Sequence, residues 1–261
     1  MLINERQSHI LEILADRQAV SVAELSALLN VSGVTIRTDL NQLAEQGRLV
    51  RTHGGAMLLG EKTRQELTFA TRQQLQGDQK ARIGELAASL VQPRNSILLD
   101  ASTTALAVGQ ALKTCQDLGD LSVVTTGVWT ALELLGIAHL NVILVGGNLR
   151  TITGSTTGSI ARDVLNKINI HRAFLGAWGI TVDHGLTEAS LQEVELKQHI
   201  IERSQEVIAV VDSTKFGRVG LSTYAPVEKI DRIVTDEGAP ADVVAEFRKR
   251  GVEVCIAERV G

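Results

Sequence analysis

The sequence predicts an α/β protein of two domains, a small N-terminal winged helix-turn-helix and a larger C-terminal doubly wound, Rossmann-like domain. The first observation is a pair of short helical patterns followed by a glycine-tipped hairpin pattern within residues 21–54. The second is a series of short apolar runs that alternate with helical stretches from Ser96 onward. The third is the length of 261 residues, which is enough for two domains. We place the winged domain at 1–57, a connector at 58–75 and the α/β domain at 76–261.

Three helices are expected in the N-terminal domain. The first covers residues 4–17. The second begins at Ser21, because Ser21 and Glu24 have the spacing of a capping box. The third begins after Ser32, a favourable N-cap residue, and three of its apolar residues recur at helical spacing, so they face the core. These three residues are Ile36, Leu40 and Leu43.

The opposite face of the third helix is expected to point outward. There Arg37 can reach a guanine or a phosphate, and Asn41 can pair with adenine. Val34 can contact a thymine methyl group. The amides after Ser32 and the hydroxyl of Thr35 suit a phosphate at the helix N-terminus. These residue types indicate a helix that reads the DNA major groove.

A basic hairpin, or wing, is predicted after this helix. Arg48 and Arg51 lie along it, and residues 53–55 form its turn. A solvated helix and hairpin explains each signal taken singly, but their order and spacing together favour DNA binding. The expected DNA-contacting residues are Ser32, Val34, Thr35, Arg37, Thr38, Asn41, Arg48, Arg51, His53 and Gly54.

The same region resembles the N-terminal signature of the DeoR-type transcriptional regulators. The resemblance is carried by residues 31–40, VSGVTIRTDL, and 51–56, RTHGGA. That family usually has two consecutive arginines in the recognition helix, whereas the second is Thr38 here. The resemblance implies a sequence-specific DNA-binding regulator, most often a repressor, and Thr38 implies an operator of its own.

Composition disfavours several other classes of protein. No apolar run is long enough for a membrane span, and the N-terminus lacks the basic and apolar regions of a signal peptide, so we expect a cytoplasmic protein. Cys115 and Cys255 are far apart and the histidines are scattered, so neither a metal site nor a cofactor is expected. The net charge of −4 disfavours indiscriminate nucleic-acid binding and favours a homo-oligomer, a dimer or tetramer, on a two-part DNA site.

The C-terminal half predicts a mostly parallel sheet covered by helices on both faces, because its strands are apolar throughout and separated by helices. The strands are expected at 97–100, 121–126, 142–145, 173–177, 207–212, 232–235 and 252–255. The helices are expected near 80–90, 103–113, 129–136, 158–167, 190–204 and 240–250.

Hydroxyl groups and glycines follow the predicted strand ends, where ligands bind in such sheets. Together with the charge of Lys215 they suit a phosphate or another small anion. In any one loop these residues are explained by strand ends and helix caps, but five loops at one sheet edge favour a ligand. The candidate effector-binding residues are Asp100, Ser102, Thr103, Thr104, Thr125, Thr126, Gly127, Gly146, Gly147, Trp178, Glu193 and Lys215.

These motifs are also similar to the sensor domain of the same regulator family, which resembles sugar-phosphate isomerases such as ribose-5-phosphate isomerase. The resemblance implies a phosphorylated sugar, or a similar metabolite, as effector. Three positions depart from the family pattern: Ala101 replaces a glycine, Thr126 replaces an asparagine, and Trp178 replaces an aspartate. Trp178 removes a carboxylate and adds a flat surface that can stack on a sugar ring.

Two other functions stay open at this point. The first is a sugar-phosphate isomerase or deaminase fused to a DNA-binding module, with Glu193, Asp212 and Lys215 as its acid–base groups. Against it, Glu193 and Lys197 are four residues apart on a helix, so a surface ion pair explains them equally well, and Trp178 removes a carboxylate. We therefore assign no catalytic residue. The second is a protein-interaction module that uses the winged domain.

Overall fold

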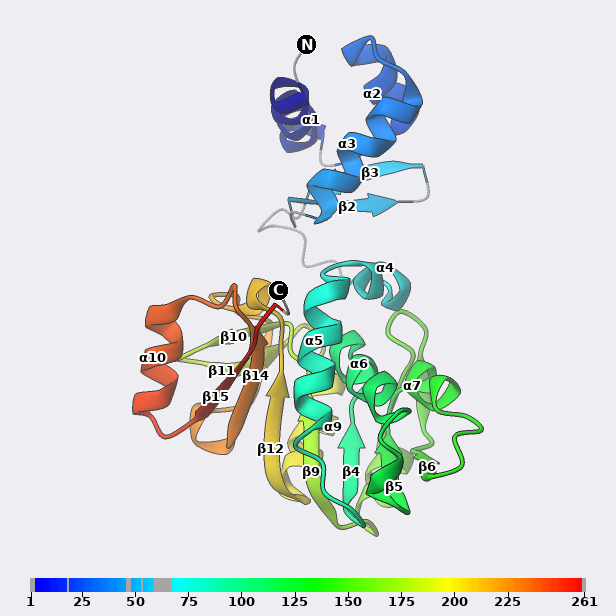
Figure 1. Ribbon diagram of the computed structural model, residues 1–261, viewed down its shortest axis with the longest axis vertical. Helices are drawn as coiled ribbons and strands as arrows, with labels where there is room; N and C mark the ends of the chain where they lie inside the picture. Colours follow the sequence, from blue (N-terminus) through cyan, green and yellow to red (C-terminus); the bar gives the residue numbers. More distant parts are fainter. Residues whose placement is uncertain (1–2, 18, 46–47, 53, 59–66, 260–261) are drawn as a thin grey trace. The chain divides into compact units, whose positions relative to one another are not determined.

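The computed structural model describes residues 3–17, 19–45, 48–52, 54–58 and 67–259. The chain divides into two compact units, Met1–Gln76 and Gly77–Gly261, which we call unit 1 and unit 2 (Figure 1). No helix among the described residues is long and apolar enough to cross a membrane.

Unit 1 contains the helix-turn-helix and the hairpin that the sequence predicts. Its strands form one antiparallel sheet in the order β1-β3-β2, so the hairpin gains a third strand that precedes the helix pair. The elements are α1 (Ile3–Arg17), β1 (Ala19–Ser21), α2 (Val22–Leu29), α3 (Gly33–Glu45), β2 (Leu49–Thr52), β3 (Gly55–Leu58) and α4 (Phe69–Gln74).

Caps and one buried ion pair fix the helices of unit 1. Ser21 caps α2 in a capping box, because Glu24 N donates to Ser21 Oγ at 3.1 Å and Ser21 N donates to Glu24 Oε2 at 2.8 Å. Asn30 ends α2 in the left-handed conformation, with a φ of 51°. Arg6 on α1 donates to both carboxylate oxygens of Asp39 on α3, at 2.5 and 3.0 Å. This pair holds α3 at a fixed orientation against α1.

Unit 2 is built on a seven-stranded sheet in the order β15-β14-β12-β9-β4-β5-β6, and every neighbouring pair is parallel. All seven strands correspond to the predicted apolar runs. The strands are β4 (Ser96–Leu99), β5 (Leu121–Thr125), β6 (Leu140–Leu144), β9 (Ile170–Leu175), β12 (Ser204–Val210), β14 (Arg232–Asp236) and β15 (Glu253–Ala257).

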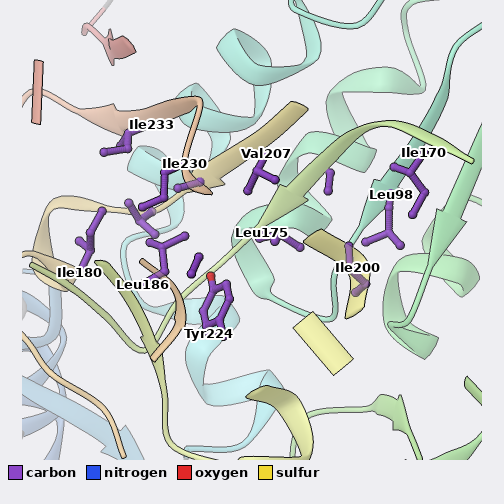
Figure 2. Close-up of a cluster of buried hydrophobic side chains, with 14 of the residues drawn as sticks. Leu98, Ile170, Leu175, Ile180, Leu186, Ile200, Val207, Tyr224, Ile230 and Ile233 are labelled. Carbon is purple, nitrogen blue, oxygen red and sulfur yellow. The ribbon is translucent and has the colours of Figure 1, made fainter. Parts of the chain in front are cut away.

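Helices cover both faces of this sheet. One buried cluster joins α5 (Gly77–Ala88) and α6 (Thr103–Leu112) to one face of the sheet, and it includes Leu134, the residue that follows α7 (Val128–Glu133). The other cluster joins α8 (Ser159–Leu165), α9 (Leu191–Glu202) and α10 (Ala241–Lys249) to the opposite face, and Figure 2 shows part of it. The unit is therefore doubly wound, as predicted, and its strand order reverses between β4 and β9.

Two small antiparallel sheets were not predicted. The first is the hairpin of β7 (Asn148–Arg150) and β8 (Ser155–Thr157). The second contains β10 (Gly179–Thr181), β11 (Gly185–Glu188) and β13 (Ser222–Ala225). These strands have three or four residues and are rich in glycine and threonine, so no apolar run marks them.

Candidate functional site

The outward face of α3 has the exposure that the sequence predicts. Ile36, Leu40 and Leu43 are fully buried, which leaves the other side of the helix to solvent. Arg37 and Asn41 are exposed on that side. Val34 is also on that side, with 71% of its surface exposed.

The N-terminus of α3 is capped by its own hydroxyl groups. Thr35 N donates to Ser32 Oγ at 3.2 Å, and the hydroxyls of Ser32 and Thr35 lie 2.9 Å apart. Thr38 Oγ1 donates to the carbonyl of Val34, one turn earlier, at 3.2 Å. The hydroxyl that stands where an arginine is usual is therefore bonded to its own helix.

Arg51 of the wing lies in an unusual environment. It is half-buried, and its Nη1 atom is buried with no hydrogen-bond partner among the described residues. Burial, together with the charge of nearby Arg37, lowers the pKa of Arg51. Two guanidinium groups close together, one of them incompletely bonded, form a favourable place for an anion.

The structure describes two of the other predicted wing residues, Arg48 and Gly54. Arg48 is exposed. Gly54 is exposed, and its carbonyl accepts from Val22 N at 2.7 Å, which ties the wing turn to the start of α2. His53 lies outside the described residues.

In unit 2, the loops that follow β4, β5 and β9 come together at the reversal of strand order. A Cβ atom added to Gly176 would lie 2.4 Å from Ser102 Cβ, and one added to Gly127 would lie 3.0 Å from Ala101 Cα. The first approach leaves no room for a larger residue at position 176 unless Ser102 moves, and the second would be a tight contact. The structure therefore brings three of the five predicted loops into direct contact.

Asp100 organises these loops from a buried position at the end of β4. Its Oδ1 accepts from Ser102 N at 2.9 Å, and its Oδ2 accepts from Gly176 N at 2.9 Å. Ser102 in turn caps α6, since Ala105 N donates to Ser102 Oγ at 3.0 Å. The first amides of a helix have no partner within the helix, so those of Thr103 and Thr104 are presented at this edge of the sheet.

Lys197, on α9, lies at the centre of a buried charged cluster. Its Nζ is 2.9 Å from Asp100 Oδ2, and it donates to Glu188 Oε1 at 2.6 Å and to the Gly176 carbonyl at 2.8 Å. Tyr224 donates its hydroxyl to the same carbonyl at 2.7 Å, and Lys197 Nζ lies 4.9 Å from the centre of the tyrosine ring. Figure 2 shows Tyr224 among the buried side chains of the apolar cluster to which it belongs.

The ammonium group of Lys197 is stabilised by the carboxylates around it. Burial alone would lower the pKa of Lys197, but the carboxylates of Asp100 and Glu188 hold that pKa well above its ordinary value. Burial raises the pKa of Glu188 despite the opposing charge of Lys197. Lys197 therefore stays protonated, so its amine is not a nucleophile or a base at neutral pH.

Glu193, one turn before Lys197 on α9, has a separate set of partners. Arg150 Nη1 lies 2.8 Å from Glu193 Oε1, and Ser155 Oγ donates to the same oxygen at 2.5 Å. Arg150 and Ser155 belong to β7 and β8, so Glu193 fastens that hairpin to α9. The alternative of a surface ion pair between Glu193 and Lys197 is wrong, because the two side chains are only 6% and 4% exposed and each binds other groups.

The other candidate effector residues occupy the same edge of the sheet. Thr125 Oγ1 accepts from Gly127 N at 3.0 Å, and the carbonyl of Thr126 accepts from Thr156 N at 2.8 Å, so both buried threonines shape the turn after β5. Gly146 and Gly147 are exposed after β6.

Trp178 and Lys215 lie beyond the ends of β9 and β12. Trp178 is half-buried, and its N donates to the carbonyl of Thr187 at 2.9 Å. Lys215 is half-buried in the short helix Ser213–Lys215. Gly217 N donates to the carbonyl of Ile180 at 3.0 Å, which joins this segment to the strand that follows Trp178.

Sequence reasoning missed Glu188, Tyr224 and Arg150 as members of these clusters. Glu188 and Tyr224 belong to the sheet of β10, β11 and β13, which no apolar run in the sequence predicts. The sequence held one signal for the burial of Lys197, because Lys197 lies three residues before the apolar Ile200 and so on the same stripe of α9. Within the described residues, no group of three metal-ligating side chains is placed to hold an ion.

Comparison with known protein families supports the division of roles between the two units. The model of the DeoR-like helix-turn-helix domain matches residues 6–62. The model of the DeoR C terminal sensor domain matches residues 75–237.

Individual proteins are similar over almost the whole chain. The HTH-type transcriptional regulator GolR of Listeria innocua is 35% identical over 97% of this chain and 98% of its own length. The glycerol-3-phosphate regulon repressor of Escherichia coli is 33% identical over 92% of this chain and 93% of its own. Among solved structures, ribose 5 phosphate isomerase A of Neisseria gonorrhoeae covers 52% of each chain at 14% identity, with a TM-score of 0.39.

Proposed function

Since the chain belongs to the DeoR family of transcriptional regulators, we propose that it represses genes of carbohydrate metabolism and is controlled by a phosphorylated sugar or a similar small metabolite. Unit 1 binds the operator, and the loops at the β4–β9 reversal of unit 2 bind the effector. The observation that carries the proposal is that one chain combines two features. The first is the exposed face of α3, and the second is the set of loops that contact one another through glycines where the strand order reverses.

The DNA-binding part of the proposal is supported by the geometry of α3 and the wing. Val34, Arg37 and Asn41 present an apolar group, a guanidinium and an amide on one exposed face, which are the groups that read base edges. Arg51, with its unbonded Nη1, is assigned to a backbone phosphate.

The effector-binding part rests on the N-terminus of α6 and the segments near it. Ser102, Thr103 and Thr104 offer amides and hydroxyls to an anionic group, and Lys215 adds a positive charge. Trp178 offers a ring face to a sugar. Asp100 and Glu193 are positioning residues, because their carboxylates are already bound to Lys197 and to Arg150.

We further propose that unit 2 senses its ligand without converting it. Isomerisation of a sugar phosphate needs a carboxylate or similar base free to move a proton at the sugar carbons. In this cluster Asp100 and Glu188 are paired with a lysine that stays protonated. A ligand then acts by favouring one arrangement of the chain over another, to the extent of its differential affinity for them.

The function is tested by operator binding and release. The full chain is expected to shift a duplex from the DNA upstream of its own gene but not a scrambled duplex, and one or more pentose, hexose or triose phosphates should release it. The Lys215→Ala variant should bind the operator normally and fail to respond. Recovery of the sugar phosphate unchanged is expected, and its conversion to an isomer would show an enzyme instead. Absence of any specific shift would contradict the regulator function.

Intrinsic fluorescence gives a second test of the effector site. Trp129 and Trp178 are the two tryptophans of the chain, and Trp178 follows β9 at the proposed site. A sugar phosphate that displaces water there should change the emission saturably. Trp178→Phe should lose most of that signal, whereas Trp129→Phe, which alters an indole that is 47% exposed on α7, should keep it. A compound that releases the operator without changing the emission of either indole would place the effector elsewhere.

A further inference from the structure

Exposed apolar side chains gather at one edge of unit 2. Six of the thirteen large hydrophobic side chains that are exposed among the described residues lie between residues 129 and 152. They come from α7 and the residues just after it, from the end of β6 and from the β7–β8 hairpin. Figure 1 shows α7 and β6 beyond β5 at this edge of the sheet. We call this surface the apolar face; its residues are Trp129, Leu132, Leu135, Leu144, Leu149 and Ile152.

The elements of the apolar face are joined to one another. Val128 N, at the start of α7, donates to the carbonyl of Gly154 in the hairpin turn at 2.9 Å. The indole of Trp129 lies against the same turn, since a Cβ atom added to Gly154 would lie 2.4 Å from Trp129 Nε1. The helix and the hairpin therefore form one surface. Exposed apolar residues that are contiguous mark an interaction site more often than scattered ones do.

The apolar face carries no unpaired formal charge. Between residues 128 and 152 the ionisable side chains are Glu133, His139 and Arg150, and His139 Nε2 lies 3.0 Å from the carbonyl of Leu112. Glu133 binds Lys113 at 2.9 Å, and Arg150 binds the buried Glu193 at 2.8 Å. A nucleic acid or an anionic membrane requires basic groups, which this face lacks. Depletion of charge with retention of aromatic and aliphatic groups is typical of the centre of a protein–protein interface.

The neighbouring strand, β6, is an open edge of the sheet. Among the described strands it pairs only with β5. Its sequence, LNVIL, has none of the charges or prolines with which proteins usually protect edges. Val145 N donates to Thr125 on β5 and the His139 carbonyl accepts from Leu121 N, so by alternation the backbone groups of Val142 and Leu144 point away from β5. At the opposite edge, β15 carries Glu253, which is paired with Arg232.

We propose that a second copy of this chain docks on the apolar face, with the β6 strands of the two copies antiparallel about a twofold axis. The chain has a net charge of −4, so two copies meet with least repulsion where the surface is neutral. A twofold axis brings each face against itself and gives each open β6 edge a partner of matching polarity. The inference rests on the proposed function in one respect: a two-part operator needs two reading domains.

The test measures self-association of the full chain without DNA. Sedimentation velocity is run from submicromolar to tens of micromolar concentrations on three proteins: wild type, the variant Leu132→Glu/Leu149→Glu, and the control Val219→Glu/Leu221→Glu. All four substituted side chains are more than half exposed, and those of the control lie outside the apolar face. Wild type and control are expected to form dimers or larger species, and the face variant is expected to dissociate with a dissociation constant at least about tenfold higher.

Hydrogen exchange locates the contact on β6. The amides of Val142 and Leu144 should exchange slowly in wild type at high concentration and rapidly in the face variant. Near-ultraviolet circular dichroism confirms that each variant is folded. A wild type that stays monomeric, a face variant that associates like the control, or outward amides that exchange freely in the dimer would each overturn the proposal. If a monomeric wild type still binds its operator specifically, the docking proposal fails while the proposed function stands.

Discussion

Replacing Lys197 with methionine is expected to lower the free energy of unfolding of unit 2 by about 3–5 kcal/mol, the usual cost of removing one partner of a buried ion pair. Methionine has a similar length, so packing changes little. The substitution leaves Asp100 and Glu188 buried near each other without the ammonium group that lies 2.9 and 2.6 Å from them. The Gly176 carbonyl also loses one of its donors. Effector response should be lost together with stability, because Asp100, which orients Ser102, loses the ammonium group that holds its own carboxylate.

Chemical denaturation followed by far-ultraviolet circular dichroism measures this effect. Lys167→Met is the matched control, since it makes the same substitution at an exposed position. The control should change the free energy of unfolding by less than about 0.5 kcal/mol. The double variant Lys197→Met/Glu188→Gln should recover part of the loss, because one uncompensated carboxylate is removed. Equal stability of Lys197→Met and wild type would show that the cluster contributes no net stabilisation.

The pH dependence of the loss identifies its electrostatic origin. The pKa of Glu188 is already raised by burial in the folded protein, above the ordinary value of 4.5 that applies to the unfolded chain. The folded state therefore binds more protons than the unfolded state above that value, and stability falls as the pH rises through the folded pKa. Removing Lys197 raises the folded pKa further. The difference between Lys197→Met and wild type should thus be larger at about pH 7 than at about pH 5.

The parallel sheet was predictable because burial on both faces leaves a direct record in the sequence. The runs 97–99 and 207–211, for example, are apolar at consecutive positions, and each lies in or extends from a strand of the sheet. The glycines and hydroxyls after those runs then located the sheet edge, because parallel strands end on one side. A short polar strand such as β11 pairs with strands that are distant in the sequence, so no local pattern predicts its partners.

Which charged side chains pair in the buried cluster could not be predicted from local sequence spacing either. The spacing of Glu193 and Lys197 is compatible with a surface pair, yet α9 packs between the sheet and β11, and its charged stripe faces inward. Lys197 then pairs with Asp100 and Glu188, which come from two other strand ends. Burial by tertiary packing, not helical spacing, decides which charges meet. In α3, by contrast, helical spacing was enough, because three apolar residues on one face identify the opposite face as exposed.

Alanine at Arg37 is expected to weaken binding to the operator by about 1–3 kcal/mol, which is about fivefold to 150-fold, if its guanidinium makes a bidentate contact with a guanine. Arg37 is exposed on the reading face of α3, so the substitution leaves the fold of unit 1 intact. Binding to a scrambled duplex should change much less. The specificity ratio between the two duplexes should therefore fall.

Arg51 provides the contrasting case within the same interface. Its buried Nη1 is unbonded among the described residues, and a DNA phosphate would supply the missing partner. Arg51→Ala should weaken binding to specific and scrambled duplexes alike and flatten the dependence of affinity on salt, because a phosphate contact releases counterions and carries no sequence information. Arg162→Ala, which removes an exposed arginine of unit 2, serves as the control. Gel-shift titrations on both duplexes at two salt concentrations separate the three variants. Unchanged specificity in Arg37→Ala, or a loss confined to the operator in Arg51→Ala, would reverse the assignment of reading helix and wing.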